Sequence, residues 1–198
     1  MIIKICALTP ELYRELSAAF SDVKTVEIVA LPFENINGCD AMVSAANSFG
    51  LMDGGVDLAI TRFFGEQLQH RVQKHILRQY LGEQPVGTAF VIGTRKPEFP
   101  WLIHAPTMRV PLIIAGTDHV YQATRAALVA IYHHNENSRS PIKSVVFPAM
   151  GTGCGRVSPK SCAMQMRAAL DSVTRRPNYL SWDFANQRQS AIESIACV

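Results

Sequence analysis

The sequence contains no apolar run that approaches the roughly 20 residues needed to cross a bilayer. Charged residues make up 18% of the chain, well above a membrane composition. The N-terminal stretch MIIKICALTPEL has one lysine, a short apolar run and no small-residue cleavage site, so it predicts a first strand rather than a signal peptide. We therefore expect a cytoplasmic protein without a membrane partner.

Cysteine is scarce and scattered. There are five cysteines, an odd number, and no CxxC pair or His/Cys cluster occurs. This pattern predicts reduced thiols rather than a disulfide framework. It also gives no indication of a structural zinc site, and we expect neither a metal nor a cofactor. The cysteines are Cys6, Cys39, Cys154, Cys162 and Cys197.

Positive charge is sparse as well. Nineteen Lys and Arg stand against 16 Asp and Glu, which gives a formal net charge of +3. The tightest basic run is Arg175-Arg176, whereas nucleic-acid-binding domains usually carry a denser basic stripe. The charge pattern predicts a solvated surface and no nucleic-acid partner, and it leaves the oligomeric state open.

Short β-rich apolar runs alternate with segments of helical spacing. A chain of 198 residues with 48% hydrophobic content can build one sizeable core. Strands are predicted at 2–8, 25–31, 41–46, 88–94, 101–107 and 144–150, and helices at 10–20, 56–81, 119–134 and 159–173. Gly65 either interrupts the second helix or marks a close contact. The alternation predicts an α/β layered domain with a largely parallel sheet.

Two adjacent glycines mark the first loop of interest. The segment DAMVSAANSFGLMDGGVD (40–57) leads from a strand through Gly54-Gly55 into a helix. Glycines at a helix start leave backbone N–H groups uncovered, so a diphosphate can approach the positive helix end. Asn47 and Asp57 bracket the loop and can reach sugar hydroxyls, which is the arrangement that an ADP-ribose site requires. Alternatively, Asn47 is a turn former and Asp57 a favourable first-turn charge.

A second glycine-bearing loop, GTGCG (151–155), follows a later strand. It is neither a Walker A motif nor a dinucleotide fingerprint, and alone it is equally well explained as a tight strand-to-helix turn. In an open α/β sheet, ligands bind at the carboxyl ends of strands, where such loops gather. Together the two loops predict a diphosphate site that uses backbone N–H groups in place of a lysine.

These motifs resemble the macro domain family over roughly residues 25–173. The resemblance rests on LPFENI, DAMVSAANS, GGVD, LIHAPT and VVFPAMGTGCG. It implies a three-layer α/β/α fold with a mixed, largely parallel sheet. The macro-like domain would cover 1–176, including an added strand and helix at 1–24, and 177–198 would be a peripheral segment with no assigned element.

The resemblance also implies which residues bind ADP-ribose or an ADP-ribosylated macromolecule. Asn47 and Asp57 would contact the distal ribose and are the candidate catalytic pair. Glu34 would accept from the adenine amino group, or Asn35 would do so after a one-residue shift. The implied ligand-binding set is Glu34, Asn35, Ser48, Phe49, Gly54, Gly55, Val56, Gly151, Thr152, Gly153, Cys154 and Gly155.

Three departures from the family pattern bear on catalysis. Ser44 stands where family hydrolases usually carry Asn, Met52-Asp53 replace part of a glycine run, and Cys154 to Arg156 lack an aromatic residue that packs on the distal ribose. Binding is therefore expected. Hydrolysis of an ADP-ribosyl bond or of ADP-ribose phosphate stays open against a non-enzymatic reader or sensor.

Several residues also have plain structural interpretations. Cys154 is read as a small, buried loop residue, since no His or Asp is traceable as its base. His104 is read as a core histidine and Arg109 as a surface salt-bridge partner. Phe49 stacks on a base or ribose, or packs in the core.

Overall fold

A six-stranded sheet forms the centre of the molecule. The computed structural model describes residues 1–196 and 198. The strands are β1 (Ile2–Cys6), β2 (Val26–Val29), β3 (Ala41–Asn47), β4 (Phe90–Gly93), β5 (Trp101–Met108) and β6 (Ser144–Pro148). They lie in the order β2-β1-β6-β3-β5-β4, and every pairing is parallel except that of β4 with β5. The predicted mixed, largely parallel sheet is confirmed.

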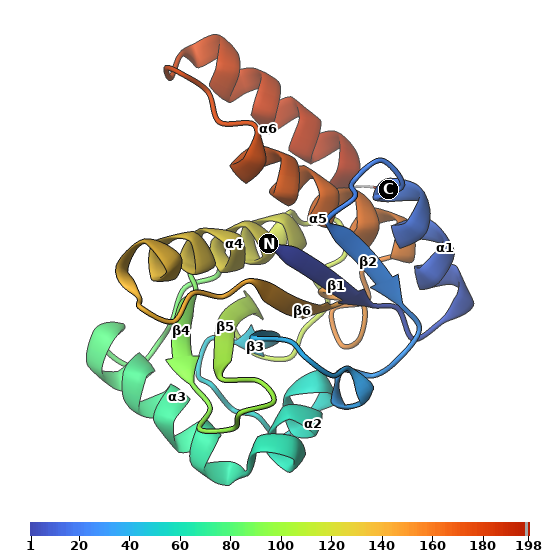
Figure 1. Cartoon of the computed structure of the whole chain (residues 1–198). Coiled ribbons are helices and arrows are strands. Elements are labelled where there is room, and N and C mark those ends of the chain that lie inside the picture. The colour runs from blue at the N-terminus through green and yellow to red at the C-terminus, as the bar shows by residue number, and fades with distance from the viewer. Residues whose placement is uncertain (197) are drawn as a thin grey trace.

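Helices cover both faces of the sheet and complete three layers (Figure 1). One face carries α1 (Pro10–Ala19), α4 (His119–Asn137) and α5 (Pro159–Thr174), and the other carries α2 (Gly55–Phe64), α3 (Glu66–Gln79) and the 3-10 turn η1 (Phe33–Asn35). Because successive strand residues face opposite sides, Leu102 of β5 packs in the core under α2 and α3, while Ile103 packs in the core under α4 and α5.

Local sequence signals set the helix ends. The Thr9 hydroxyl caps α1 by accepting from the backbone N–H of Leu12 at 3.2 Å, and Ser158 caps α5 by accepting from the N–H of Ser161 at 3.0 Å. The single helix predicted over 56–81 is two helices. Gly65 has a φ of +89°, a backbone conformation that residues other than glycine rarely adopt. At this residue α2 ends and α3 begins.

The first strand is an inner strand of the sheet. β1 pairs with β2 on one side and with β6 on the other, in a register that sets Cys6 beside Pro148. β6 in turn pairs with β3. The carboxyl ends of β1, β6, β3 and β5 consequently lie along one edge of the sheet, where ligand-binding loops gather in such folds.

A last helix, α6 (Trp182–Ala196), was not predicted from the sequence. It packs on α5 through Ile192 and Ala196, while its start projects beyond the body of the protein (Figure 1). The side chain of Trp182 is 83% exposed. Among the described residues, none belongs to a helix with the length and apolar character that a membrane span requires.

We propose that residues 177–198 are peripheral, and a chain ending at Arg176 tests this. The two buried side chains of α6 contribute little net stability after the entropy of ordering the segment is subtracted. The shortened chain should unfold cooperatively in urea and lose less stability than Leu16→Ala, a core substitution expected to cost about 3 kcal/mol. An insoluble or non-cooperative product would contradict this proposal.

Candidate functional site

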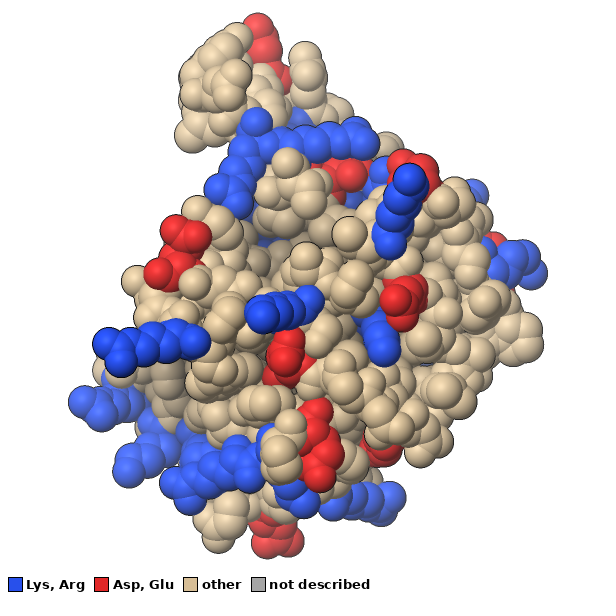
Figure 2. Space-filling view, in the orientation of Figure 1, with Lys and Arg blue, Asp and Glu red and all other residues tan. Residues whose placement is uncertain are grey.

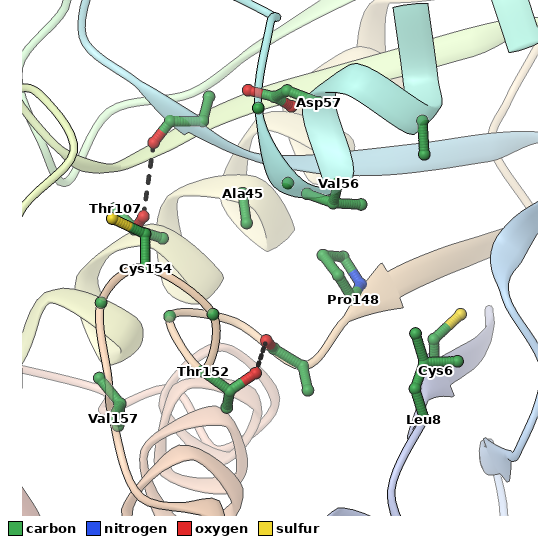
Figure 3. A pocket seen from close by; sticks show the side chains of 18 of the residues that line it. Cys6, Leu8, Ala45, Val56, Asp57, Thr107, Pro148, Thr152, Cys154 and Val157 are labelled. Atoms are coloured by element: carbon green, nitrogen blue, oxygen red, sulfur yellow. Dashed lines mark hydrogen bonds between the residues drawn. The ribbon is translucent and has the colours of Figure 1, made fainter. Parts of the chain in front are cut away.

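A cavity of about 850 Å³ opens at the carboxyl edge of the sheet. Both predicted loops line it: Figure 3 shows Val56 and Asp57 on one side and Thr152 and Cys154 on the other. The structure therefore brings together two segments that lie about a hundred residues apart in the sequence. The predicted residues that line the cavity are Glu34, Asn47, Gly54, Gly55, Val56, Asp57, Gly151, Thr152, Gly153, Cys154 and Gly155.

Asn47 shapes the first loop with its own side chain. Its Oδ1 accepts from the backbone N–H groups of Phe49 (3.0 Å) and Leu51 (3.2 Å), and its Nδ2 donates to the carbonyl of Leu51 (2.6 Å). This is the turn-forming role that the sequence left open beside the ligand role. Asn47 lines the cavity, and the loop uses its Oδ1 and one of its two Nδ2 hydrogens, which leaves one N–H for a ligand.

The start of α2 presents backbone donors to the cavity. Gly54 occupies the N-cap position, and no side chain caps the helix there. A Cβ built on Gly54 would meet no atom within 4 Å, so a ligand can approach the first-turn N–H groups closely. Uncapped amides and the positive end of the helix dipole make this helix start attractive to an anion.

The second loop is held in a tight turn by its glycines. A Cβ at Gly155 would lie 2.5 Å from the carbonyl oxygen of Gly151, and one at Gly151 would lie 2.7 Å from Cγ2 of Val120. The turn is closed by bonds from the N–H groups of Arg156 and Val157 to the carbonyls of Gly153 and Gly151. Within the described chain, the amides of residues 152–155 donate to no protein acceptor. They form a second set of backbone donors without a protein partner, in a loop that lines the same cavity as the start of α2.

Asp57 is a buried carboxyl group at one end of the cavity. It is 5% exposed, and its Oδ1 accepts a hydrogen bond from the Ser44 hydroxyl at 2.5 Å. Burial raises the pKa of Asp57 to about 6, an effect that the Ser44 bond opposes and the charge of Asp53 reinforces. A carboxyl with a pKa near neutrality, placed in a cavity, is suited to accept a proton.

No cationic side chain lines this cavity among the residues that the structure describes. Its charged residues are all acidic: Glu11, Glu34, Asp53 and Asp57. In the face shown in Figure 2, basic side chains crowd most densely at the edge over α3, which carries Arg71, Lys74 and Arg78, none of them lining the cavity. An anionic group inside the cavity would therefore meet backbone N–H groups and neutral side-chain donors such as the Thr9 hydroxyl, and no charged donor among the described residues.

Three of the predicted ligand-binding residues are not brought to the cavity. Asn35 is exposed outside it, so the register that points to Glu34 is the one that fits the cavity. Ser48 is buried, and its N–H donates to the carbonyls of Met108 and Arg109, which holds the loop to the end of β5. Phe49 is half-buried and does not line the cavity.

The expected burial of Cys154 is wrong, because its side chain is exposed at the tip of the second loop. The packing that sequence reasoning assigned to it is provided instead by Gly151 and Gly155 against Ile114. His104 was expected to be a satisfied core histidine; its burial is confirmed, but only Nδ1, 2.7 Å from Oε1 of Gln84, has a partner, and Nε2 is buried without one among the described residues. Arg109 forms the predicted surface salt bridge, with Glu83 at 2.6 Å.

Sequence reasoning missed one wall of the cavity. Cys6, Leu8 and Glu11 line it from the end of β1 and the start of α1 (Figure 3 labels Cys6 and Leu8). The rule that carboxyl ends of parallel strands gather at one edge would have included them, had β1 been predicted as an inner strand. Burial raises the pKa of the Cys6 thiol to about 12, so this wall carries no reactive thiolate.

Comparisons with known proteins agree with this architecture. A sequence model of the Macro domain matches residues 43–166. An uncharacterised protein of Aquifex aeolicus is 38% identical over 137 residues, covering 69% of this chain and 73% of that protein. One of Aeropyrum pernix is 29% identical over 142 residues, covering 71% of this chain and 69% of that protein.

Solved structures give the same result at the level of the fold. The macrodomain of Mycobacterium tuberculosis DarG has a TM-score of 0.56 at 20% identity, covering 68% of this chain and 83% of that one. An Oceanobacillus iheyensis macrodomain with ADP also has a TM-score of 0.56, at 19% identity, covering 79% of this chain and 84% of that one. A variant of the latter protein was solved with ADPR, with a TM-score of 0.56 at 19% identity and coverage of 79% and 86%.

The buried state of Asp57 makes a prediction about stability. Its pKa is about 6 in the folded protein against an ordinary value of 3.8, so the folded state binds the proton more tightly. The resulting stabilisation is complete below about pH 4 and is lost as the pH rises through 6. Asp57→Asn, which cannot ionise, should therefore be more stable than the wild type at pH 7.5 by up to about 3 kcal/mol.

Urea unfolding at pH 4 and pH 7.5 measures this difference, which should shrink at the lower pH. Asp183→Asn, at an exposed position of α6, is the control and should change stability little at either pH. An Asp57→Asn protein less stable than the wild type at pH 7.5 would refute the proposed state of this carboxyl.

Proposed function

Because the chain belongs to the macro domain family, we propose that its cavity binds ADP-ribose, either free or attached to a macromolecule. The proposal is supported by two loops that line one cavity and whose backbone N–H groups have no protein acceptor among the described residues. Solved macrodomains described as holding ADPR and ADP support it. A cytoplasmic location is part of this proposal, supported by the four described cysteines, all of which are free.

The diphosphate lies between the two loops in this proposal. The start of α2 and the 152–155 turn each supply main-chain N–H groups, and neither needs a lysine or arginine. The carboxylates serve the uncharged parts of the ligand, since they accept hydrogen bonds from sugar hydroxyls and from an amino group. Glu34, beside the buried ring of Phe33, is placed for the adenine, and Asp57 for the distal ribose.

The same placement supports hydrolysis of an ADP-ribosyl bond. Asp57 would take a proton from a water whose oxygen attacks the anomeric carbon of the distal ribose. The bond from that carbon to its substituent breaks, and the bonding electrons leave with the substituent. A carboxyl group whose pKa lies near 6 is ionised at neutral pH and still basic enough to accept this proton.

A non-enzymatic reader or sensor is the second candidate, and one observation favours it. The side chain of Asn47 is bonded to the backbone of Phe49 and Leu51, which leaves one Nδ2 hydrogen as the only donor it can offer a water. Of the expected catalytic pair, Asp57 is therefore the one with a fully available proton acceptor. Nucleic-acid binding in the cavity gains no support, because no described lining residue is a cation.

Binding is tested by filling the space over the first helix start. Gly54 has extended backbone angles and open surroundings, so Gly54→Val should fold normally while its side chain covers the α2 amides. We expect the affinity for ADP-ribose in calorimetry to fall at least about tenfold, which corresponds to the loss of roughly one good hydrogen bond to a charged group.

The matched control is Gly93→Val on β4, where a Cβ makes only an ordinary 3.8 Å contact with Trp101 and does not face the cavity. AMP and NAD, titrated in parallel, separate recognition of the whole ligand from recognition of adenine. Equal affinities for ADP-ribose in Gly54→Val and the wild type would exclude the diphosphate site proposed above.

Catalysis is tested by following the release of ADP-ribose from ADP-ribosylated protein and of phosphate from ADP-ribose phosphate. If the protein is a hydrolase, Asp57→Asn should lower turnover by at least about 100-fold, the usual contribution of a general base. Calorimetry establishes that the variant still binds ADP-ribose. A wild type that binds ADP-ribose but turns over neither substrate is a reader.

A further inference from the structure

We propose that Ser44 is the positioning residue for Asp57, an inference that rests on the function proposed above. Ser44 lies on β3 beneath α2 and is 0% exposed. Its hydroxyl donates to Oδ1 of Asp57 across a sequence separation of 13 residues. Because Ser44 is fully buried, it does not contact the ligand in this proposal. It affects ligand binding through its hydrogen bond to the Asp57 carboxyl group.

Ser44 supplies the one hydrogen bond that holds this carboxyl in place. Throughout the described chain, no other side chain and no backbone N–H donates to the Asp57 carboxyl group. Oδ2 therefore has no protein partner among the described residues, and it is not among the buried polar atoms that lack one, so it is not fully buried. Ser44 of β3 binds Oδ1, and Oδ2 is left accessible from the cavity that Asp57 lines. One carboxylate oxygen is bound by the protein and the other is available to a ribose hydroxyl or a water.

The other ionisable groups around Asp57 cannot substitute for Ser44. On the first loop, Asp53 is a like charge that raises the pKa of Asp57. Across the cavity, Cys154 is exposed on the second loop and makes no bond to Asp57. The basic residues of the neighbouring helices, Arg62 on α2 and those of α3, have no effect on the pKa of Asp57 and form no ion pair with it.

His104 on β5 is the remaining candidate hydrogen-bond donor to Asp57, and its protonation state excludes it from that role. The sheet register pairs Ser44 with His104, so both side chains share the face under α2 and α3. The Gln84 amide donates from Nε2 to the carbonyl of His104, which turns its Oε1 toward Nδ1 of the ring. Nδ1 must then carry the proton, and Nε2 is a bare acceptor without a partner.

His104 therefore offers Asp57 neither a proton nor a positive charge. Burial lowers the pKa of His104 to about 3, so the ring stays neutral across the physiological range. With one hydrogen to give, Ser44 bonds to the carboxylate rather than to the neutral ring, because hydrogen bonds to charged groups are the stronger. Among the described residues, Ser44 alone donates a hydrogen bond to the carboxylate form of Asp57.

The proposal is tested on the ligand-free protein by following the carboxyl ¹³C signal of Asp57 in an NMR titration, assigned by its absence in Asp57→Asn. In Ser44→Ala the midpoint should rise by at least about one pH unit, since the donor that favours the charged form is gone. Ser172→Ala, at a buried serine of α5 outside the cavity, should leave the midpoint unchanged. Ser44→Thr, which keeps the hydroxyl, should return it toward the wild-type value.

Calorimetry at pH 7 provides the second measurement. Ser44→Ala should bind ADP-ribose at least about tenfold more weakly, and Ser172→Ala should bind as the wild type does. An unchanged Asp57 midpoint in Ser44→Ala overturns the positioning role, whatever the protein binds. A wild type that does not bind ADP-ribose overturns the proposed function instead, and the titration of Asp57 is still measurable in that case.

Discussion

The site depends on one electrostatic constraint: a cavity bounded by carboxylates has no cationic side chain among its described residues. An anion that enters would have to be stabilised by uncharged donors, chiefly those of the main chain. The two donor sets, at the start of α2 and in the second loop, meet this constraint because both consist of N–H groups without a protein acceptor. Much of the local architecture serves to hold those backbone segments at the right place.

The packing of each loop follows from that requirement. Asn47 uses its side chain to brace the first loop, and the second loop closes on Ile114 and Val120 with no space for a side chain at Gly151 or Gly155. The sheet then brings the loops together, because β3 and β6 are neighbours and both end at the same edge. Asp57 completes the arrangement as a largely buried carboxyl group that lines the cavity and accepts a hydrogen bond from Ser44.

The sequence predicted the features that local chemistry determines. The Thr9 and Ser158 caps set two helix starts, short β-rich apolar runs located the strands, helical spacing located most helices, and the glycine loops pointed to the main cavity. The order of strands does not follow from such patterns. Consequently β1 was taken for an added strand, and the cavity wall that contains Cys6 was missed.

The remaining differences arise from tertiary contacts. α6 buries only two side chains, so its sequence has too weak an apolar stripe to predict a helix. The exposure of Cys154 depends on packing by residues around Ile114 that are far away in the sequence. Likewise, in the sequence Ser44 is only a departure from a family motif. Its hydrogen bond to Asp57 forms because the fold packs α2 against β3, which the sequence pattern does not predict.

Recognition through the main chain also affects how such a protein can diverge. Every residue type except proline carries the same N–H group, so loop positions 152–154 can accept other non-proline residues without losing a donor, provided that the crowded glycines on either side are kept. In the proposed ADP-ribose site, anion recognition would thus depend on the backbone conformation of the two loops more than on the identity of their side chains.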